Sequence, residues 1–161
     1  MSYPPKHHQD DYQNHLIEVI KTYPLATVIS VINNEPLITH LPLIFENGKL
    51  IGHIDIYNPQ AKLLKDDNDV TLIFSGPECY ISPSIYSTTQ FPTWNYIKVH
   101  LIGRVKAIES KAALKQSLIN MTEFLEAPQH KYVLKSDNPR LDRNLNYIEM
   151  FEIEITHWEG K

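Results

Sequence analysis

The sequence lacks the cysteines needed for an internal disulfide and the long apolar runs needed for a membrane span. Its 161 residues contain one cysteine, Cys79, so no disulfide can form within the chain. No apolar run approaches the roughly 18 residues of a membrane span, and the start lacks the charged-then-apolar pattern of a signal peptide. These absences predict a protein of the reducing cytoplasm that has no membrane partner.

An excess of positive charge is also absent. The chain has 15 Lys and Arg against 19 Asp and Glu, a formal net charge of -4, which excludes nucleic-acid binding by bulk basicity. Its 42% of hydrophobic and 21% of charged residues are close to globular averages and exclude a disordered chain. Because no linker-like tract divides the sequence, we expect a single domain over residues 1–161.

Several motifs that commonly carry chemistry are missing. Neither GxGxxG nor GxxxxGK[ST] occurs, so any bound phosphate has to be held by side chains and turns. The eight histidines include no His-x-x-x-His pair, so we expect them to be solvated or to cap the core and predict no metal site. Cys79 has no activating base near it in the sequence, and a small buried hydrophobe is the favoured interpretation over a nucleophile.

What the sequence does contain is a change of period after Pro24. Before it, apolar residues at helical spacing predict a helix capped by Asp10 or Asp11. After it, β-branched and alternating stretches predict strands at 25–31, 37–45, 49–55, 70–74, 79–81, 94–108 and 151–158. Ser110 is expected to cap a second long helix, and Pro139 to begin a short one.

The predicted strands follow one another through turns, without regular alternation of strand and helix. Asn47-Gly48 is the pair preferred in type I′ hairpins, and stretch 58–64 is predicted to be a turn or short helix. This pattern favours an antiparallel sheet that closes on itself, with helices outside it or at its ends. The predicted fold class is mainly β with flanking helices, in a small antiparallel barrel.

The Asn47-Gly48 hairpin also predicts a register. Continuing a two-residue turn places Pro42 opposite His53 and His40 opposite Asp55, so His40 and His53 would lie diagonally on one face, roughly 7 to 8 Å apart. That face is expected to be a site or an interface, with a wet outer face as the alternative. Pro42 requires a sheet edge or a bulge. The opposite face is predicted to join the core through Leu41, Leu43, Phe45, Leu50 and Ile54.

The predicted strand 94–108 carries an unusual face. Trp94, Tyr96, Lys98, His100 and Arg104 alternate along it, a set too aromatic for an ordinary solvent face and too charged for a core. Aromatic rings beside basic groups favour a subunit interface or an anionic aromatic ligand such as a flavin phosphate. A chance arrangement on a solvated face is the alternative.

Four groups of motifs resemble one family. They are Thr39-His40-Leu41-Pro42-Leu43; Gly52-His53 with Asn58-Pro59-Gln60; Ile73 to Pro77 with Tyr80 to Ser84; and Pro92-Thr93-Trp94-Asn95-Tyr96 with Val99-His100. Together they resemble the PaiB family, FMN-binding proteins described as negative transcriptional regulators of protease synthesis and sporulation. The resemblance implies a split β-barrel related to pyridoxamine-phosphate oxidases and flavin reductases, and a homodimer with FMN at the subunit boundary.

The resemblance also implies where the flavin would lie. In related barrels it follows the first hairpin, with its phosphate near the short helix after it. The positions carried over are Thr39, His40, His53, Ile54, Asn58 and Gln60, and then Trp94, Asn95 and Lys98 on the long strand. The amides of Asn58 and Gln60 can donate to phosphate oxygens, and Lys98 can supply charge. We predict that His40, His53 or both contact the isoalloxazine or the ribityl chain.

Three functions stay open at this point. The first is an FMN-binding module, and the second is a regulator, whose action is expected to be indirect because the sequence has no helix-turn-helix and no basic arm for direct DNA binding. The third is a flavin-dependent oxidoreductase acting with a nicotinamide cofactor or another small-molecule substrate. No catalytic residue is assigned, because the flavin itself would carry the chemistry.

Overall fold

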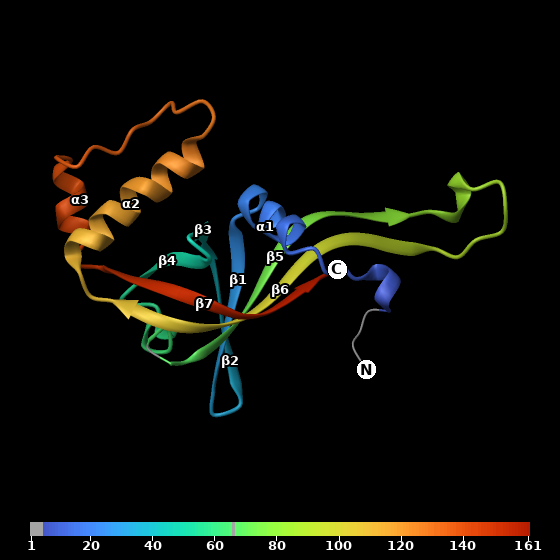
Figure 1. The fold of residues 1–161 in the computed structure, drawn as a ribbon, viewed down its shortest axis with the longest axis horizontal. Coiled ribbons are helices and arrows are strands. Elements are labelled where there is room, and N and C mark those ends of the chain that lie inside the picture. Colours follow the sequence, from blue (N-terminus) through green and yellow to red (C-terminus); the bar gives the residue numbers. More distant parts are fainter. Residues whose placement is uncertain (1–4, 66) are drawn as a thin grey trace.

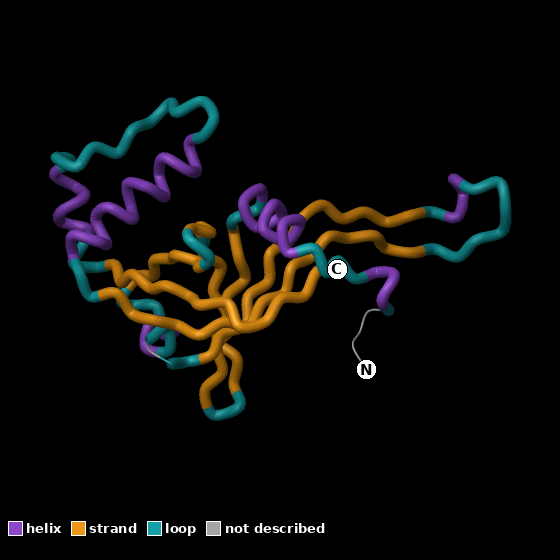
Figure 2. The backbone as a smooth tube through the Cα atoms, viewed as in Figure 1, coloured by secondary structure: helices purple, strands orange, loops and turns teal. Residues whose placement is uncertain are grey.

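The structure, a computed structural model, describes residues 5–65 and 67–161. It is built mainly of strands (Figure 1, Figure 2). The strands are β1 (Leu25–Ile32), β2 (Glu35–Pro42), β3 (Ile44–Glu46), β4 (Lys49–Asp55), β5 (Asp69–Ile81), β6 (Thr93–Ile108) and β7 (Ile148–Gly160). The helices are α1 (Gln13–Thr22), α2 (Lys111–Glu126) and α3 (Pro139–Asn144), with 3-10 turns η1 (Lys6–His8), η2 (Pro59–Lys62) and η3 (Pro83–Ile85).

All these strands form one sheet in the order β2-β1-β5-β6-β7-β4-β3, and each pairing is antiparallel. The two edges, β2 and β3, are consecutive stretches of chain separated only by Leu43. The sheet therefore closes on itself. The predicted fold class, a mainly β antiparallel barrel with flanking helices, is confirmed.

The segment 35–46 changes partner at Leu43. Up to Pro42 it pairs with β1, and from Ile44 it pairs with β4. Pro42 has no N–H to donate, and the Leu43 N–H donates to the Pro24 carbonyl at 2.9 Å. The predicted single strand 37–45 is thus two strands, whereas the predicted position of Pro42 at a sheet edge is confirmed.

The interior of the barrel is the main core. Its fully buried side chains include Val28, Leu43, Leu50, Leu72, Phe74, Val99, Leu101 and Ile153. Leu16 and Ile20 of α1 pack against this cluster. A Cβ at Gly52 would come within 2.4 Å of Leu43 Cδ2 and 2.7 Å of Phe151 Cζ, so no larger side chain fits there. The predicted core face of the hairpin is confirmed, with Leu41 and Phe45 packed at its margin.

Local signals set the helix ends. The Ser110 hydroxyl accepts a hydrogen bond from the Ala113 N–H, and Asn138 does the same for Arg140, so the predicted starts of α2 and α3 are confirmed. α1 begins at Gln13, later than the Asp10 or Asp11 cap predicted, because Asp10 accepts from the Tyr12 N–H ahead of the helix. α2 and α3 share a second apolar cluster with β7, formed by Leu114, Leu141, Leu145 and Met150.

β5 and β6 continue beyond the barrel as a two-stranded ribbon, opposite α2 and α3 (Figure 1). The predicted strands 70–74 and 79–81 are one strand with a bulge, since the ladder shifts between Ser75 and Glu78. We call residues 76–97 the arm. Cys79 lies on it and is exposed, so the prediction of a buried cysteine is wrong: Cys79 pairs with Asn95 in the part of β5 and β6 that extends beyond the barrel (Figure 2).

Candidate functional site

The hairpin histidines do not share a face in the way predicted. His40 pairs with Thr27 and Pro42 with Leu25, while His53 pairs with Met150 of β7. The predicted pairing of Pro42 with His53, and of His40 with Asp55, is therefore wrong. The physical reason is the change of partner at Leu43, which removes β2 from β4 before the ladder reaches these residues.

His53 lies between the barrel and α2. Its Nε2 is 3.0 Å from the Ser117 hydroxyl, and its Nδ1 is buried without a hydrogen-bond partner among the described residues. Burial lowers the pKa of His53 to about 4, so the ring is neutral at pH 7. Nε2 thus links β4 to α2 through Ser117, and Nδ1 is available to hydrogen-bond a ligand group that reaches it. Contact between His53 and the flavin stays a prediction.

Thr39, Asn58 and Gln60, three of the predicted cofactor residues, lie together in the structure, and their contact with a flavin stays a prediction. The Asn58 side-chain amide donates to Thr39 Oγ1 at 3.1 Å, and the Gln60 N–H donates to Asn58 Oδ1 at 2.9 Å. The buried Gln60 amide donates to the Val28 carbonyl and the Ser30 hydroxyl. These donors tie η2 to β1 and β2. Ile54 is a core residue, 3% exposed.

Side chains of five strands form two rows on the outside of the barrel, a surface that was not predicted from the sequence. One row across the sheet consists of His40, Thr27, Ile73, His100 and Glu159, each paired with the next. The neighbouring row consists of Ile38, Ile29, Thr71, Ile102 and His157, also paired in order. We call these two rows the outer face.

The outer face mixes four isoleucines with polar side chains, and two of the isoleucines are exposed. Ile38 is 56% exposed and Ile102 is 43% exposed. Burial lowers the pKa of His100, as do Lys161 and Lys98, against an opposing effect of Glu159. In the sequence, residues 25–31 carry apolar side chains at both alternating sets of positions. The alternation therefore could not show which side of this strand faces solvent.

Trp94, Asn95 and Lys98 lie on or beside the arm, away from the group around Thr39. Trp94 packs near Tyr80, with ring centroids 6.2 Å apart, and Asn95 pairs with Cys79. Lys98 Nζ lies 2.7 Å from Glu78 Oε2. The structure thus divides the predicted cofactor residues into a barrel group and an arm group.

Two clefts flank the arm. One, of about 520 Å³, lies between α1 and the root of the arm, with Val19, Tyr23, Tyr96 and Ile97 among its lining residues. The other, of about 700 Å³, is lined by Pro5, His8, Thr93, Trp94, Asn95, Tyr96 and Lys161. Both volumes are in the usual range of small-molecule sites, roughly 300 to 1,000 Å³.

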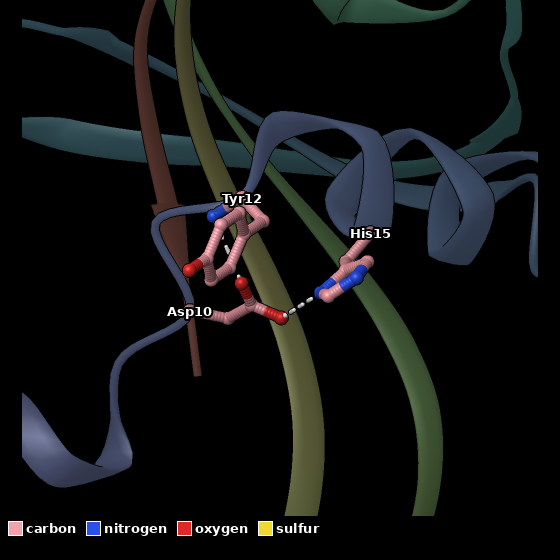
Figure 3. Close-up of polar contacts among 3 residues, drawn as sticks. All are labelled: Asp10, Tyr12 and His15. Atoms are coloured by element: carbon pink, nitrogen blue, oxygen red, sulfur yellow. Dashed lines mark hydrogen bonds and ion pairs between the residues drawn. The ribbon is translucent and has the colours of Figure 1, made fainter.

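A carboxylate and a histidine meet at the first cleft (Figure 3). Asp10 Oδ2 lies 2.8 Å from His15 Nδ1, and Asp10 Oδ1 accepts from the Tyr12 N–H at 2.9 Å. Burial acts to raise the pKa of Asp10, but the Tyr12 N–H and His15 outweigh it, so this pKa is lowered. The pair fixes the start of α1 and gives the mouth of the cleft a polar rim.

Within residues 5–65 and 67–161, no helix has the length and apolar character to cross a membrane. Nor do three side chains of His, Cys, Asp or Glu gather there in a group able to hold a metal ion.

Residues 2–157 match the family described as "Putative FMN-binding domain". The sequence is similar to the protease synthase and sporulation protein PAI 2 of Bacillus subtilis, with 34% identity over 159 residues, 95% of this chain and 76% of that protein. This similarity confirms the resemblance drawn from the motifs.

Two solved structures are similar to the fold. One is the FAD and heme binding protein from Mycobacterium smegmatis, with a TM-score of 0.77 and 17% identity over 96% of this chain and 72% of that one. The other is the flavocytochrome Anf3 from Azotobacter vinelandii, with a TM-score of 0.76 and 19% identity over 98% and 71%. At such identities the likeness shows the fold alone, the split barrel that the resemblance implied.

Proposed function

The chain belongs to the PaiB type of FMN-binding split-barrel proteins, and we propose that it works as a homodimer that binds FMN at the subunit boundary. The match to the FMN-binding family over residues 2–157 carries the proposal. A cytoplasmic location is part of it, supported by the single cysteine.

The outer face supports a homodimer. Monomers rarely expose contiguous apolar patches larger than a few hundred Å², and such patches mark interfaces or ligand sites. Here Leu25, Val31, Ile38 and Ile102 are between 43% and 64% exposed on the same side of the sheet. If two copies met on this side, the row that contains Ile38, Ile29 and Ile102 would be buried. His40 would then lie next to the boundary between the two subunits.

The residues present fit the ring of a flavin better than its phosphate. His40 is exposed beside apolar side chains, an environment that suits a planar ring with polar edges. For the phosphate, the side-chain amide of Asn58 already donates to Thr39 and that of Gln60 to Val28 and Ser30, and Lys98 bonds to Glu78. Lys98 can supply the compensating charge only by leaving Glu78.

The test is the absorption spectrum of the purified protein, followed by titration with FMN. A ligand at 100 times its dissociation constant adds about 2.7 kcal/mol of stability, which raises the melting temperature by roughly 5 to 11 °C for a chain of this size. Absence of flavin absorbance together with an unchanged melting temperature would refute the proposal.

For the biological role, we propose regulation that does not involve direct DNA recognition. The 34% identity to the sporulation protein PAI 2 supports regulation, while the net charge of -4 argues against DNA as the partner. A sequence-specific footprint with a dissociation constant near 10⁻⁸ M, the usual range at physiological salt, would contradict this.

A flavin-dependent oxidoreductase is the second candidate. The clefts beside α1 and the arm, about 520 and 700 Å³ in volume, favour it because they are large enough for a small-molecule substrate. Bound flavin would supply the redox chemistry, and the chain's own residues would orient the substrate and exclude water. Bleaching of bound flavin by NADH or NADPH, followed by turnover, separates this enzyme from a binding protein.

A further inference from the structure

The cleft between α1 and the root of the arm, here called the α1 cleft, is built on a fixed corner of the chain. The Asp10 N–H donates to the Gly160 carbonyl at 3.2 Å, so β7 holds the backbone of Asp10. A Cβ at Gly160 would come within 2.5 Å of the Asp10 carbonyl oxygen and 2.4 Å of Leu16 Cδ2, so this segment packs directly on β7. The Tyr12 N–H and His15 each hold one Asp10 carboxylate oxygen (Figure 3). The polar end of the cleft is therefore positioned before any ligand binds.

The groups at this polar end are hydrogen-bond acceptors. Because His15 Nδ1 lies 2.8 Å from Asp10 Oδ2, the neutral ring carries its proton on Nδ1 and a lone pair on Nε2. Glu18 follows His15 by three residues, on the same side of α1, and also lines the cleft. Within residues 5–65 and 67–161, Glu18 forms no ion pair. Two carboxylates and a ring nitrogen thus line the cleft as acceptors.

The lysines that line the α1 cleft do not offset these carboxylates. Lys98 Nζ lies 2.7 Å from Glu78 Oε2, and Lys161 Nζ lies 2.7 Å from Glu159 Oε1. Neither of these two glutamates lines the cleft, so each lysine has its own counter-charge beside it. The charge left for a ligand is that of the two lining carboxylates, and it is negative.

The remaining lining of the α1 cleft is mainly apolar. Val19 of α1 lies on one side, and Pro77 and Ile97 come from the root of the arm. The rings of Tyr23 and Tyr96, 38% and 42% exposed, also line the cleft, and aromatic faces attract cations as well as apolar groups. The lining therefore suits a ligand with an apolar body and one cationic end.

From these groups we infer that the α1 cleft is a second ligand site, which takes a primary amine with an aromatic or branched apolar body. An ammonium has three N–H donors and a positive charge, which match the acceptors and the negative charge at Asp10, His15 and Glu18. A carboxylate or phosphate would instead meet acceptors at this end and lysines that are already paired. The apolar body of the amine would lie against the tyrosine rings and Ile97.

The α1 cleft is distinct from the barrel group of predicted cofactor residues. Its lining includes none of Thr39, His40, His53, Asn58 and Gln60. Of all the residues predicted to bind FMN, it includes only Lys98, which is bonded to Glu78. Amine binding at this cleft therefore goes beyond the proposed flavin site and can be measured without FMN.

Titration calorimetry at pH 7.5 with 2-phenylethylamine tests this site. The control ligand is 3-phenylpropionate, which has a similar size and shape and the opposite charge. We expect saturable binding of one amine per chain and at least tenfold weaker binding of the propionate. Absence of amine binding would overturn the site, and equal or tighter binding of the propionate would overturn the class of ligand.

A pair of matched variants locates the ammonium. Glu18→Gln is expected to weaken binding of 2-phenylethylamine about tenfold, because it removes the unpaired carboxylate from an exposed position. Glu35→Gln is the control, since it removes the same charge from an exposed position at the start of β2, at the end of the β1–β2 hairpin away from α1 (Figure 1). Glu35→Gln should bind the amine like the unaltered protein. Equal affinities of the two variants would overturn the position of the ammonium.

Competition separates the α1 cleft from the flavin site. A saturating amount of 2-phenylethylamine should change the affinity for FMN by less than twofold. Displacement of FMN by the amine would show that the cleft belongs to the flavin site and would overturn a second site. If the protein binds the amine but no FMN, the proposed function fails alone. If it binds FMN but no amine, only the amine site is wrong.

Discussion

The same two strands behave differently in the barrel and in the arm. In the barrel, β5 buries Val70, Leu72 and Phe74 while the residues between them are exposed or half-buried. Past the bulge at Gly76-Pro77, the same strand buries nothing. The barrel half is held by apolar burial within the chain, whereas the apolar side chains of the arm half are exposed. Strand pairing alone therefore does not make an equally stable structure.

The largest expected effect separates these two halves on a single strand. Phe74 is fully buried, so Phe74→Ala should lower the free energy of unfolding by about 3 to 5 kcal/mol. Tyr80→Ala, on the arm half of β5, should change the unfolding of dilute protein by less than about 0.5 kcal/mol. Urea denaturation at low protein concentration compares the two. Equal losses would show that the arm is part of the same cooperative core.

The pH dependence of stability should come from the barrel, not from the arm. Because burial lowers the pKa of His53 from 6.5 to about 4, the unfolded chain takes up a proton between these pH values that the folded chain does not. Stability should be complete above pH 6.5 and should fall with pH toward 4, by up to about 3 kcal/mol. His53→Gln should flatten this slope in denaturation measured from pH 7 to 4. His40→Gln, at an exposed position, should keep it.

Gln60 tests whether buried hydrogen bonds hold η2 on the barrel. Gln60→Leu leaves the Val28 carbonyl and the Ser30 hydroxyl without their donor, and we expect a loss of about 1 to 3 kcal/mol. Gln116→Leu is the control, because its amide bonds to Asn120 on the exposed face of α2. Similar thermal unfolding of the two variants would contradict a structural role for the Gln60 amide.

The smallest expected effect on stability is that of substituting His40, which is exposed on the barrel as the apolar residues are on the arm. His40→Ala should leave the far-ultraviolet spectrum and the melting temperature unchanged. It should weaken FMN binding by roughly 1 kcal/mol, as for one lost polar contact. Titration calorimetry measures this difference. Unaltered affinity in both His40→Ala and His53→Gln would refute a role for the hairpin histidines in flavin binding.

The elements that could be predicted from sequence are those specified by neighbouring residues. The Asn47-Gly48 turn has positive φ at both residues, 51° and 81°, as a type I′ turn requires. Ser110 caps α2, and Pro139 begins α3, as predicted. Each of these features is decided by contacts within a few residues along the chain.

The candidate site could be predicted only in part. Thr39, Asn58 and Gln60 come from the predicted motifs and lie together in the structure, because η2 follows β4 directly and folds back on β1 and β2. The position of His53 against Ser117 had no local signal, since these residues are 64 positions apart. The row of Ile38, Ile29, Thr71, Ile102 and His157 could not be recognised for the same reason, because five strands contribute one residue each.

By itself, the sequence determined the turns, the starts of α2 and α3, the alternation along the strands and the family, through short-range backbone preferences and a specific set of motifs. Only the tertiary structure decided that segment 35–46 is divided between two partners, that His40 and His53 separate, and that β5 and β6 leave the barrel as an arm. Alternation indicates which residues share a face but not which strand lies beside them. That choice is made by closure of the barrel, where Pro42 ends one ladder and the space above Gly52 admits only Leu43 and Phe151.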